Sequence, residues 1–144
     1  MNTLEHRLAD FCNHCRARGF PLTPQRLAIF RAVLASVEHP TAEDIYQAIK
    51  PEMPSLSLGT VYRTLEWLAQ ERFILRVHAP DSPTRFDANR TPHHHLVCVS
   101  CHRVADIEDP ALDHLPIAPE RLQGFAVTGH HVQIFGVCPA CQNR

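Results

Sequence analysis

The cysteines in the last third of the chain form two close pairs whose spacing indicates metal chemistry. Two residues separate Cys98 from Cys101, and two separate Cys138 from Cys141. Four thiolates in such pairs can complete the tetrahedral shell of Zn²⁺ and leave no open position, which is typical of a structural rather than a catalytic zinc. The alternative is four buried thiols without metal, but the paired spacing favours zinc. The interval between the pairs exceeds the roughly 15–20 residues of a zinc ribbon, so a helix and two strands are expected between them.

A second group of possible ligands begins with a run of three histidines, His93 to His95. On a strand, His93 and His95 would share one face and His94 would lie on the other. The further ligand types that could join His93 and His95 are His39, Asp87 and Asp106. Three imidazoles and two carboxylates suit Fe²⁺ or Mn²⁺ better than Zn²⁺, which prefers four ligands and accepts thiolate. The sequence therefore predicts a regulatory metal site, with a solvated histidine run as the alternative.

The remaining candidate ligands lead to two further hypotheses. His94, on the opposite face of the strand, could form an additional metal site with Asp113 and His130. Cys12 and Cys15 have the same spacing as the zinc pairs but lie on the apolar face of a predicted helix. We interpret these two as buried small hydrophobic side chains, with a redox role as the alternative.

Composition limits the class of protein. The chain has 144 residues, 44% of them hydrophobic and 20% charged, which is typical of a globular protein. A net charge of -1 excludes a globally basic nucleic-acid-binding protein but allows a local basic patch. No apolar run approaches the roughly 20 residues of a membrane span, and the N-terminus lacks the pattern of a signal peptide. We therefore expect a cytoplasmic protein whose paired cysteines bind metal rather than form disulfides.

The elements that position the first ligands follow from apolar periodicity and from capping residues. Helices are predicted over residues 4–18 and after the N-caps Thr23, Thr41 and Ser57. The period then changes, and turn residues between two extended stretches predict a β-hairpin over 73–87. Helices followed by a hairpin indicate a winged helix-turn-helix domain.

The second half of the chain is predicted to be a small α/β unit. Residues 88–92 are short, polar and end in proline, which indicates a hinge. Beyond it we predict strands at 96–98, 103–107, 125–128 and 132–137, with short helical pieces at 111–115 and 120–122. So small a unit needs zinc and a second subunit to complete its core. The expected fold is α+β, with a winged-helix domain over 1–87 and a metal-binding domain over 93–144.

The helix after Ser57 carries a nucleic-acid hypothesis. The side chains expected on its outer face, able to reach base edges and phosphates, are Thr60, Tyr62, Arg63 and Thr64. Arg26 from the preceding helix and Arg76 from the hairpin could contact the DNA backbone. An isolated exposed arginine is usually only solvated, so the argument depends on the position of this set on the second helix of a helix-turn-helix.

Across almost its full length the chain resembles the ferric uptake regulator family. The segments that carry the resemblance are Leu22–Arg26, His39–Tyr46, Gly59–Leu65, Arg85–Asp87, His93–Cys98 with Cys101, and Gly136–Cys141. The resemblance implies a homodimeric, metal-dependent transcriptional repressor with an N-terminal winged-helix domain and a C-terminal α/β dimerisation domain. Such a protein would bind a palindromic operator in double-stranded DNA.

The resemblance also implies roles for particular residues. It places the structural zinc on the four cysteines, the regulatory ion on His39, Asp87, His93, His95 and Asp106, and a partial third site on His94, Asp113 and His130. Asp87 and Asp106 resemble the peroxide-sensing branch, in which peroxide oxidises a ligand histidine, whereas Arg63 resembles the iron-uptake branch. Zinc-responsive members often place a cysteine in the regulatory site, and this chain has no spare cysteine for it, so that branch is the third alternative.

The predicted mechanism is a metal-dependent population shift. Ligands on the two sides of the hinge would meet only when the hinge closes, so metal would favour the closed form. A rival hypothesis is a non-heme metalloenzyme, but the sequence has no nucleophile arrangement or obvious general base. We therefore predict no enzymatic activity and no small-molecule organic substrate. A second rival, a zinc-buffering or structural interaction protein, would bind DNA no differently when loaded with metal beyond its zinc.

Overall fold

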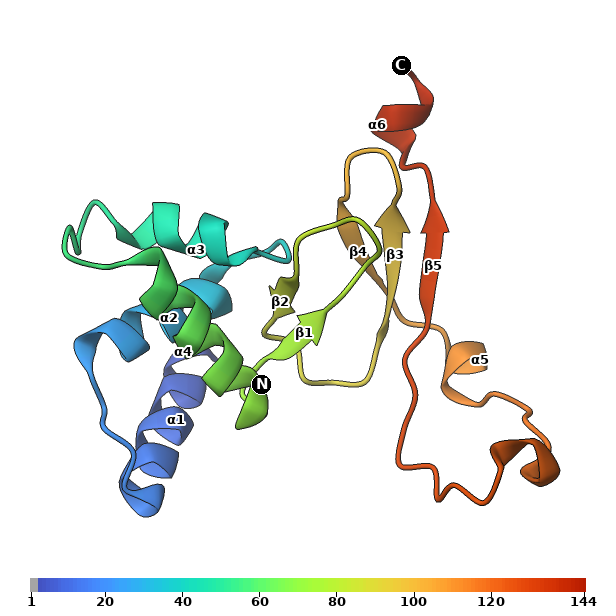
Figure 1. The fold of residues 1–144 in the computed structure, drawn as a ribbon, viewed down its shortest axis with the longest axis horizontal. Coiled ribbons are helices and arrows are strands. Elements are labelled where there is room, and N and C mark those ends of the chain that lie inside the picture. The colour runs from blue at the N-terminus through green and yellow to red at the C-terminus, as the bar shows by residue number, and fades with distance from the viewer. Residues whose placement is uncertain (1–2) are drawn as a thin grey trace. The chain divides into compact units, whose positions relative to one another are not determined.

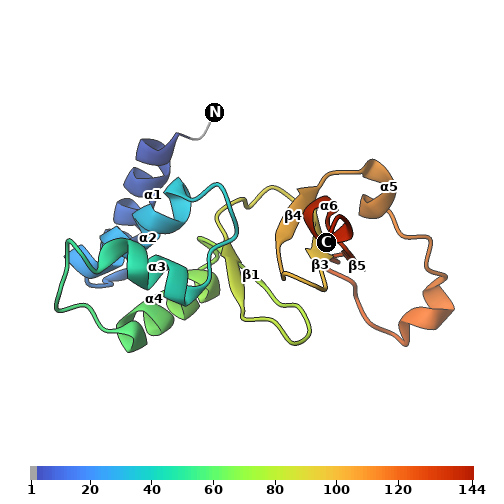
Figure 2. The ribbon, with the colours of Figure 1, turned by 90° about the horizontal axis from the view of Figure 1, so that it is seen from above.

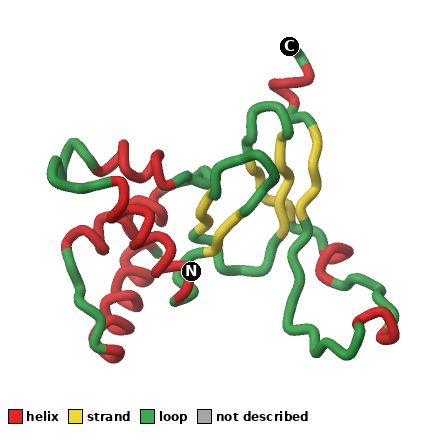
Figure 3. The backbone as a smooth tube through the Cα atoms, viewed as in Figure 1, coloured by secondary structure: helices red, strands yellow, loops and turns green. Residues whose placement is uncertain are grey.

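The computed structural model describes residues 3–144, which divide into two compact units. The first ends at Arg90 and the second begins at Thr91. Helices dominate the first unit, whereas a sheet is the main element of the second (Figure 3). The expected α+β fold class is confirmed. Among the described residues, no helix is long and apolar enough to cross a membrane.

The first unit consists of four helices followed by a β-hairpin (Figure 1). In chain order these are α1 Leu4–Arg18, α2 Pro24–Ala35, α3 Ala42–Ile49, α4 Leu58–Gln70, β1 Leu75–Val77 and β2 Arg85–Asp87. The predicted caps Thr23, Thr41 and Ser57 each accept a hydrogen bond from the backbone N–H three residues later, at 3.1 Å. Each cap satisfies a donor that would otherwise lack a partner in the first helical turn. These predicted helix starts are confirmed.

Three aromatic rings form the centre of the first unit's core. Phe11 of α1, Phe30 of α2 and Phe73, just after α4, have centroid separations of 4.9, 5.2 and 5.6 Å. Val61 and Leu65 of α4 join the same buried cluster. Burial of these side chains fixes α4 against α1 and α2, because large apolar groups gain most when they pack without voids. The packing therefore decides which face of α4 is exposed.

The second unit is built on a three-stranded sheet in the order β4-β3-β5, with β3 in the middle (Figures 1 and 2). Strand β3 His94–Cys98 pairs antiparallel with β4 Val104–Ile107 and parallel with β5 Gln133–Gly136. The chain between β4 and β5 contains α5 Pro110–Asp113 and the 3-10 helix η1 Pro119–Leu122, and α6 Pro139–Gln142 follows β5. The parallel pairing brings the last residues of β3 and β5 to the same end of the sheet.

One predicted strand of the second unit is wrong. Residues 125–128 are not extended into a sheet, and Phe125 and Val127 are 78% and 59% exposed. Their apolar alternation resembles a strand, but a strand needs a neighbour for its backbone hydrogen bonds. Within residues 3–144 the sheet offers this stretch no such partner.

Candidate metal centres and nucleic-acid interface

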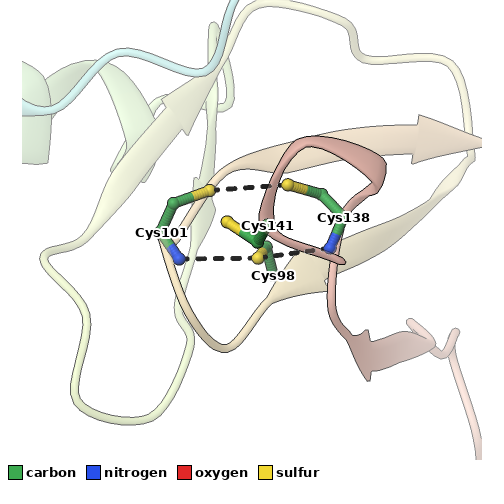
Figure 4. A group of neighbouring side chains, drawn as sticks. All are labelled: Cys98, Cys101, Cys138 and Cys141. Atoms are coloured by element: carbon green, nitrogen blue, oxygen red, sulfur yellow. Dashed lines mark hydrogen bonds between the residues drawn. The ribbon is translucent and has the colours of Figure 1, made fainter. Parts of the chain in front are cut away.

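The four paired cysteines lie at one end of the second unit's sheet. Cys98 is the last residue of β3, and Cys101 follows it in a tight turn. Cys138 is the N-cap of α6 directly after β5, and Cys141 lies in that helix. Because Cys98 is paired in register with Gly136 of β5, the two Cys-x-x-Cys segments meet. Figure 4 shows the four sulfurs turned toward a common space.

The sulfur geometry fits a tetrahedral zinc ion. The four Sγ atoms all lie within 4.8 Å of one another, and Cys101 Sγ is 3.8 Å from Cys138 Sγ. A zinc–sulfur distance of about 2.3 Å gives a tetrahedron with edges of about 3.8 Å. A disulfide would need about 2.05 Å, and every cysteine of the described chain is a free thiol. The structure thus brings the predicted zinc cysteines together at the separation that zinc requires.

Backbone amides prepare one of these sulfurs for metal. The N–H groups of Cys101 and Cys138 each donate a hydrogen bond to Cys98 Sγ, at 3.4 Å (Figure 4). These bonds lower the pKa of Cys98 to about 5, because they favour the charged form of the sulfur. The thiolate is the form that binds metal, so Cys98 is ready to coordinate near neutral pH.

A buried pair, His39 and Asp87, lies in the first unit. His39 lies between α2 and α3, and Asp87 ends β2. The backbone N–H of Phe86 donates to the carbonyl of Pro40 at 2.9 Å, which holds the two segments together. His39 Nε2 lies 3.1 Å from Asp87 Oδ2, while Asp87 Oδ1 accepts a 2.8 Å bond from the Asn89 N–H. This unit therefore presents one imidazole and one carboxylate side by side.

A three-residue cluster in the second unit, formed by His93, His95 and Asp106, is the larger ligand set. His95 and Asp106 are directly opposite each other in the β3–β4 ladder. Asp106 Oδ1 lies 3.4 Å from His93 Nε2 and 3.3 Å from His95 Nε2. Both rings are buried, whereas Asp106 is partly exposed. Two imidazole nitrogens thus converge on one carboxylate oxygen, a partial shell suited to a divalent first-row metal ion.

The other ring nitrogens of this cluster contact a second set of groups. His93 Nδ1 lies 2.6 Å from the carbonyl oxygen of Thr91. His95 Nδ1 lies 2.6 Å from Nε2 of His131, a residue that the sequence interpretation missed. The sequence contained a feature that could have identified His131, because this residue immediately follows His130 and lies just before a strand. Its relevance, however, depends on the pairing of β5 with β3.

The additional site proposed from His94 is a hydrogen-bonded group in the structure. His94 Nε2 lies 2.9 Å from Asp113 Oδ1, and His94 Nδ1 accepts a 3.0 Å bond from the Val132 N–H. His130 stacks on His94 with ring centroids 5.7 Å apart, but its Nε2 donates to the Leu112 carbonyl. The three predicted residues are neighbours, yet His94 and Asp113 bond to each other whereas the Nε2 of His130 bonds to a backbone carbonyl. Among the described residues, the metal-compatible groups do not include this one.

The exposed face of α4 differs from expectation at one position. Tyr62 and Arg63 are exposed, and Arg63 donates a 3.2 Å bond to the Thr60 hydroxyl. Thr64 is only 7% exposed, so the prediction that it faces outward is wrong. It lies three residues after Val61 and four before Leu68, both fully buried, and therefore shares their helical face.

Arginines flank this face of α4. The Arg26 guanidinium lies 4.2 Å from the centre of the Trp67 ring and donates to the Pro21 carbonyl at 2.7 Å. Arg76 Nε pairs with Glu66 at 2.8 Å. A hollow of about 300 Å³ lies between the starts of α2 and α4, and its lining includes Arg26, Arg63 and Thr60. Two helix N-termini and two cations make this hollow suitable for an anionic group.

The N-terminal cysteine pair is largely packed away. Cys15 is fully buried, and this burial raises the pKa of its thiol. Cys12 is half-buried on the same helix. The position of Cys15 fits a small hydrophobic side chain.

Comparisons with known proteins agree with this arrangement. Residues 17–135 match the profile of the Ferric uptake regulator family. The chain is 35% identical to the peroxide-responsive repressor PerR of Staphylococcus saprophyticus over 144 residues, which cover all of this chain and 97% of the relative.

Solved structures give the same result. The ferric uptake regulator of Helicobacter pylori, described as having three functional metal binding sites, superimposes with a TM-score of 0.82 at 25% identity, covering 98% of this chain and 95% of that one. PerR from Streptococcus pyogenes, described in terms of peroxide sensing, has a TM-score of 0.56 at 32% identity, covering 94% and 93%. Sequence, fold and the two ligand sets lead to one conclusion: the chain belongs to the ferric uptake regulator family.

Proposed function

We propose that this protein is a metal-dependent transcriptional repressor of metal-homeostasis or peroxide-stress genes. The observation that carries the proposal is the buried cluster in which His93 and His95 converge on Asp106, separate from the cysteine site. A structural zinc needs only the cysteines, so a second ligand set of different chemistry indicates a second, regulatory ion. Family membership and similarity to a peroxide-responsive repressor support the same function.

The regulatory ion would be shared between the two units. We infer that His39 and Asp87 bind the same Fe²⁺ or Mn²⁺ as the second unit's cluster, because neither set alone supplies enough nitrogen and oxygen ligands. When bound, this ion supplies the positive charge that two carboxylates need in order to approach each other. Without it, Asp87 and Asp106 would repel, so residues 88–92 would act as a hinge that stays open.

Operator binding would require two copies of the chain. Leu96 and Ile134 are neighbours across β3 and β5, are 40% and 41% exposed, and border an apolar groove of about 300 Å³. Such a face favours burial against another subunit, which supports a homodimer. The two α4 helices would then present Thr60, Tyr62 and Arg63 to the half-sites of a palindromic operator, with Arg26 and Arg76 near phosphates. We assign this role to a cytoplasmic regulator rather than to an enzyme.

A double substitution tests the regulatory site. We expect His93→Ala with His95→Ala to retain zinc and the dimer but to lose Mn²⁺-dependent binding to DNA, because two of the proposed ligands are removed. Binding would be measured by fluorescence anisotropy on a duplex selected from a random library by the Mn²⁺-loaded parent protein. His114→Ala, an exposed histidine in the same unit, serves as the control. Equal Mn²⁺ dependence in parent and double variant would refute the proposal.

A further inference from the structure

The two imidazoles of the second unit's cluster have different outer partners. The Nδ1 of His93 faces a backbone carbonyl, that of Thr91, at 2.6 Å. A carbonyl oxygen can only accept, so His93 carries a proton on Nδ1, and in the neutral ring its Nε2 then has no hydrogen. The Nδ1 of His95 instead faces a side chain, Nε2 of His131, at 2.6 Å. An imidazole nitrogen either donates or accepts, so the proton position on His95 depends on His131.

The backbone holds His131 at this place. The N–H of His95 donates to the carbonyl of Val132 at 3.1 Å, and His95 pairs in register with Gln133 of β5. The His131 ring lies 4.8 Å from the His95 ring and stacks on His94, with centroids 6.0 Å apart and planes at 24°. His131 is therefore ordered by the same ladder that orders His95.

We propose that His131 is the positioning residue that sets the tautomer of His95. When His131 Nε2 accepts the Nδ1 proton of His95, the lone pair of His95 Nε2 points toward Asp106, 3.3 Å away. In the opposite tautomer, His95 Nε2 would carry a proton and donate a hydrogen bond to Asp106. That proton would then take the place of the lone pair with which Nε2 would bind a metal ion. Groups that accept the outer proton of a ligand histidine fix its ring and its basicity.

This assignment rests on the proposed function, because it takes His95 to be a ligand of the regulatory ion. It adds a residue outside the predicted ligand set, and it assigns His131 no direct contact with the ion. Loss of such an outer partner typically weakens metal affinity by about 10–100-fold. We expect a loss of that order when His131 can no longer accept a proton.

Two substitutions separate hydrogen bonding from packing. His131→Leu keeps an apolar side chain of comparable bulk but removes the acceptor, whereas His131→Gln retains an acceptor in its amide oxygen. His114→Leu is the control, because His114 is an exposed histidine of the same unit that belongs to none of the ligand sets. Each full-length, zinc-loaded variant would be titrated with Mn²⁺ against a fluorescent chelator. We expect about 10–100-fold weaker binding for His131→Leu, and binding within about threefold of the parent for His131→Gln and His114→Leu.

Proton positions provide a readout that is independent of metal. Long-range nitrogen–proton NMR spectra, recorded without Mn²⁺ and above the usual imidazole pKa of about 6.5, identify the tautomer of each ring. They would be recorded on an Asp106→Ala background, because the Asp106 carboxylate, 3.3 Å from His95 Nε2, can only accept and would otherwise compete for the His95 proton. On that background we expect a protonated Nδ1 on His95 with His131 intact and in His131→Gln, and a mixture or the opposite tautomer in His131→Leu. His93, which faces a carbonyl, should stay unchanged and report that the unit is folded. A protonated Nε2 on His95 in Asp106→Ala with His131 intact would overturn the proposal even if a His131 variant failed to fold.

One more variant distinguishes this inference from the proposed function. If His95→Ala binds Mn²⁺ as tightly as the parent, His95 is no ligand, and the regulatory site itself is wrong. If His95→Ala loses affinity but His131→Leu keeps both the parental affinity and the parental tautomer, only the positioning role of His131 is refuted.

Discussion

Single atoms decide the chemistry of both ligand sets. Cys98 has a lowered pKa because two backbone amides donate to its sulfur, and those amides come from two different Cys-x-x-Cys segments. The histidines work in the same way, since His93 and His95 each use one nitrogen for an outer partner and turn the other toward Asp106. Residue type alone does not make a metal ligand. The coordinating nitrogen or sulfur must also carry no proton, and the outer hydrogen-bond partners decide this.

The cysteine site leads to a prediction about zinc. We expect Cys138→Ser to reduce bound zinc from about one ion per chain to well below one, because a hydroxyl is a much poorer zinc ligand than a thiolate. The thermal unfolding midpoint should fall as well, since zinc joins the ends of β3 and β5. Zinc released on denaturation would be measured with a chromophoric chelator. Cys12→Ser, in α1, is the control and should keep its zinc, and full zinc retention by Cys138→Ser would contradict the assignment.

At the scale of elements, α3 illustrates what local sequence determines. Thr41 accepts from the Asp44 N–H at 3.1 Å, and the Asp44 carboxylate accepts from the Thr41 N–H at 3.0 Å. This capping box is complete within four residues, so it can be predicted without tertiary information. The same box starts α3 directly after the His39–Pro40 segment and so helps to place a proposed ligand.

Removal of this cap should have a measurable cost. We expect Thr41→Ala to lower the free energy of unfolding by about 1 kcal/mol, because an amide in the first turn of α3 loses its acceptor. Thr41→Ser keeps the hydroxyl and should stay close to the parent. Urea unfolding followed by the fluorescence of Trp67, the only tryptophan, reports on the first unit. Equal stability of the alanine and serine variants would show that the cap contributes nothing.

Other features of the fold could not be predicted because they depend on distant partners. Thr64 is an exception, because its spacing from Val61 and Leu68 already indicated the buried face of α4, and only its polar side chain suggested exposure. Residues 125–128 alternate like a strand but have no neighbour in the sheet. His131 gains its role only because β5 pairs with β3 in one register. Helix starts and the cysteine pairs, in contrast, follow from residues close together in the chain.

For the whole molecule, the two ligand sets have different relations to the two units. All four cysteines of the zinc site belong to the second unit, whereas the proposed regulatory ligands come from both. Zinc removal should therefore affect the stability of one unit, and the regulatory ion should affect how the protein binds its operator. The face of α4 that we propose contacts DNA contains neither kind of ligand, so DNA binding and metal sensing should be separable by substitution.

An arginine substitution tests this separation. We expect Arg63→Ala to weaken operator binding by about 1–3 kcal/mol while Mn²⁺ affinity stays unchanged, because the side chain would contact DNA and no metal ligand. Arg121→Ala removes the same charge from an exposed position in the second unit and should bind DNA almost as the parent does. Anisotropy titrations at several salt concentrations would compare the three proteins. Similar losses for both variants would mean that Arg63 acts only through net charge.

The parallel pairing of β3 with β5 has a consequence for the chain between them. Both ends of that stretch are fixed, because β3 and β5 are joined by ladder hydrogen bonds and the cysteines at the ends of these strands share one group of ligands. Zinc coordination thus closes residues 101–138 into a loop. A longer loop would cost little additional free energy, since the entropy lost on closing a loop grows only slowly with its length. Insertions between β4 and β5 should be tolerated, and a cut there should leave two fragments held together by the β3–β5 ladder and by the zinc.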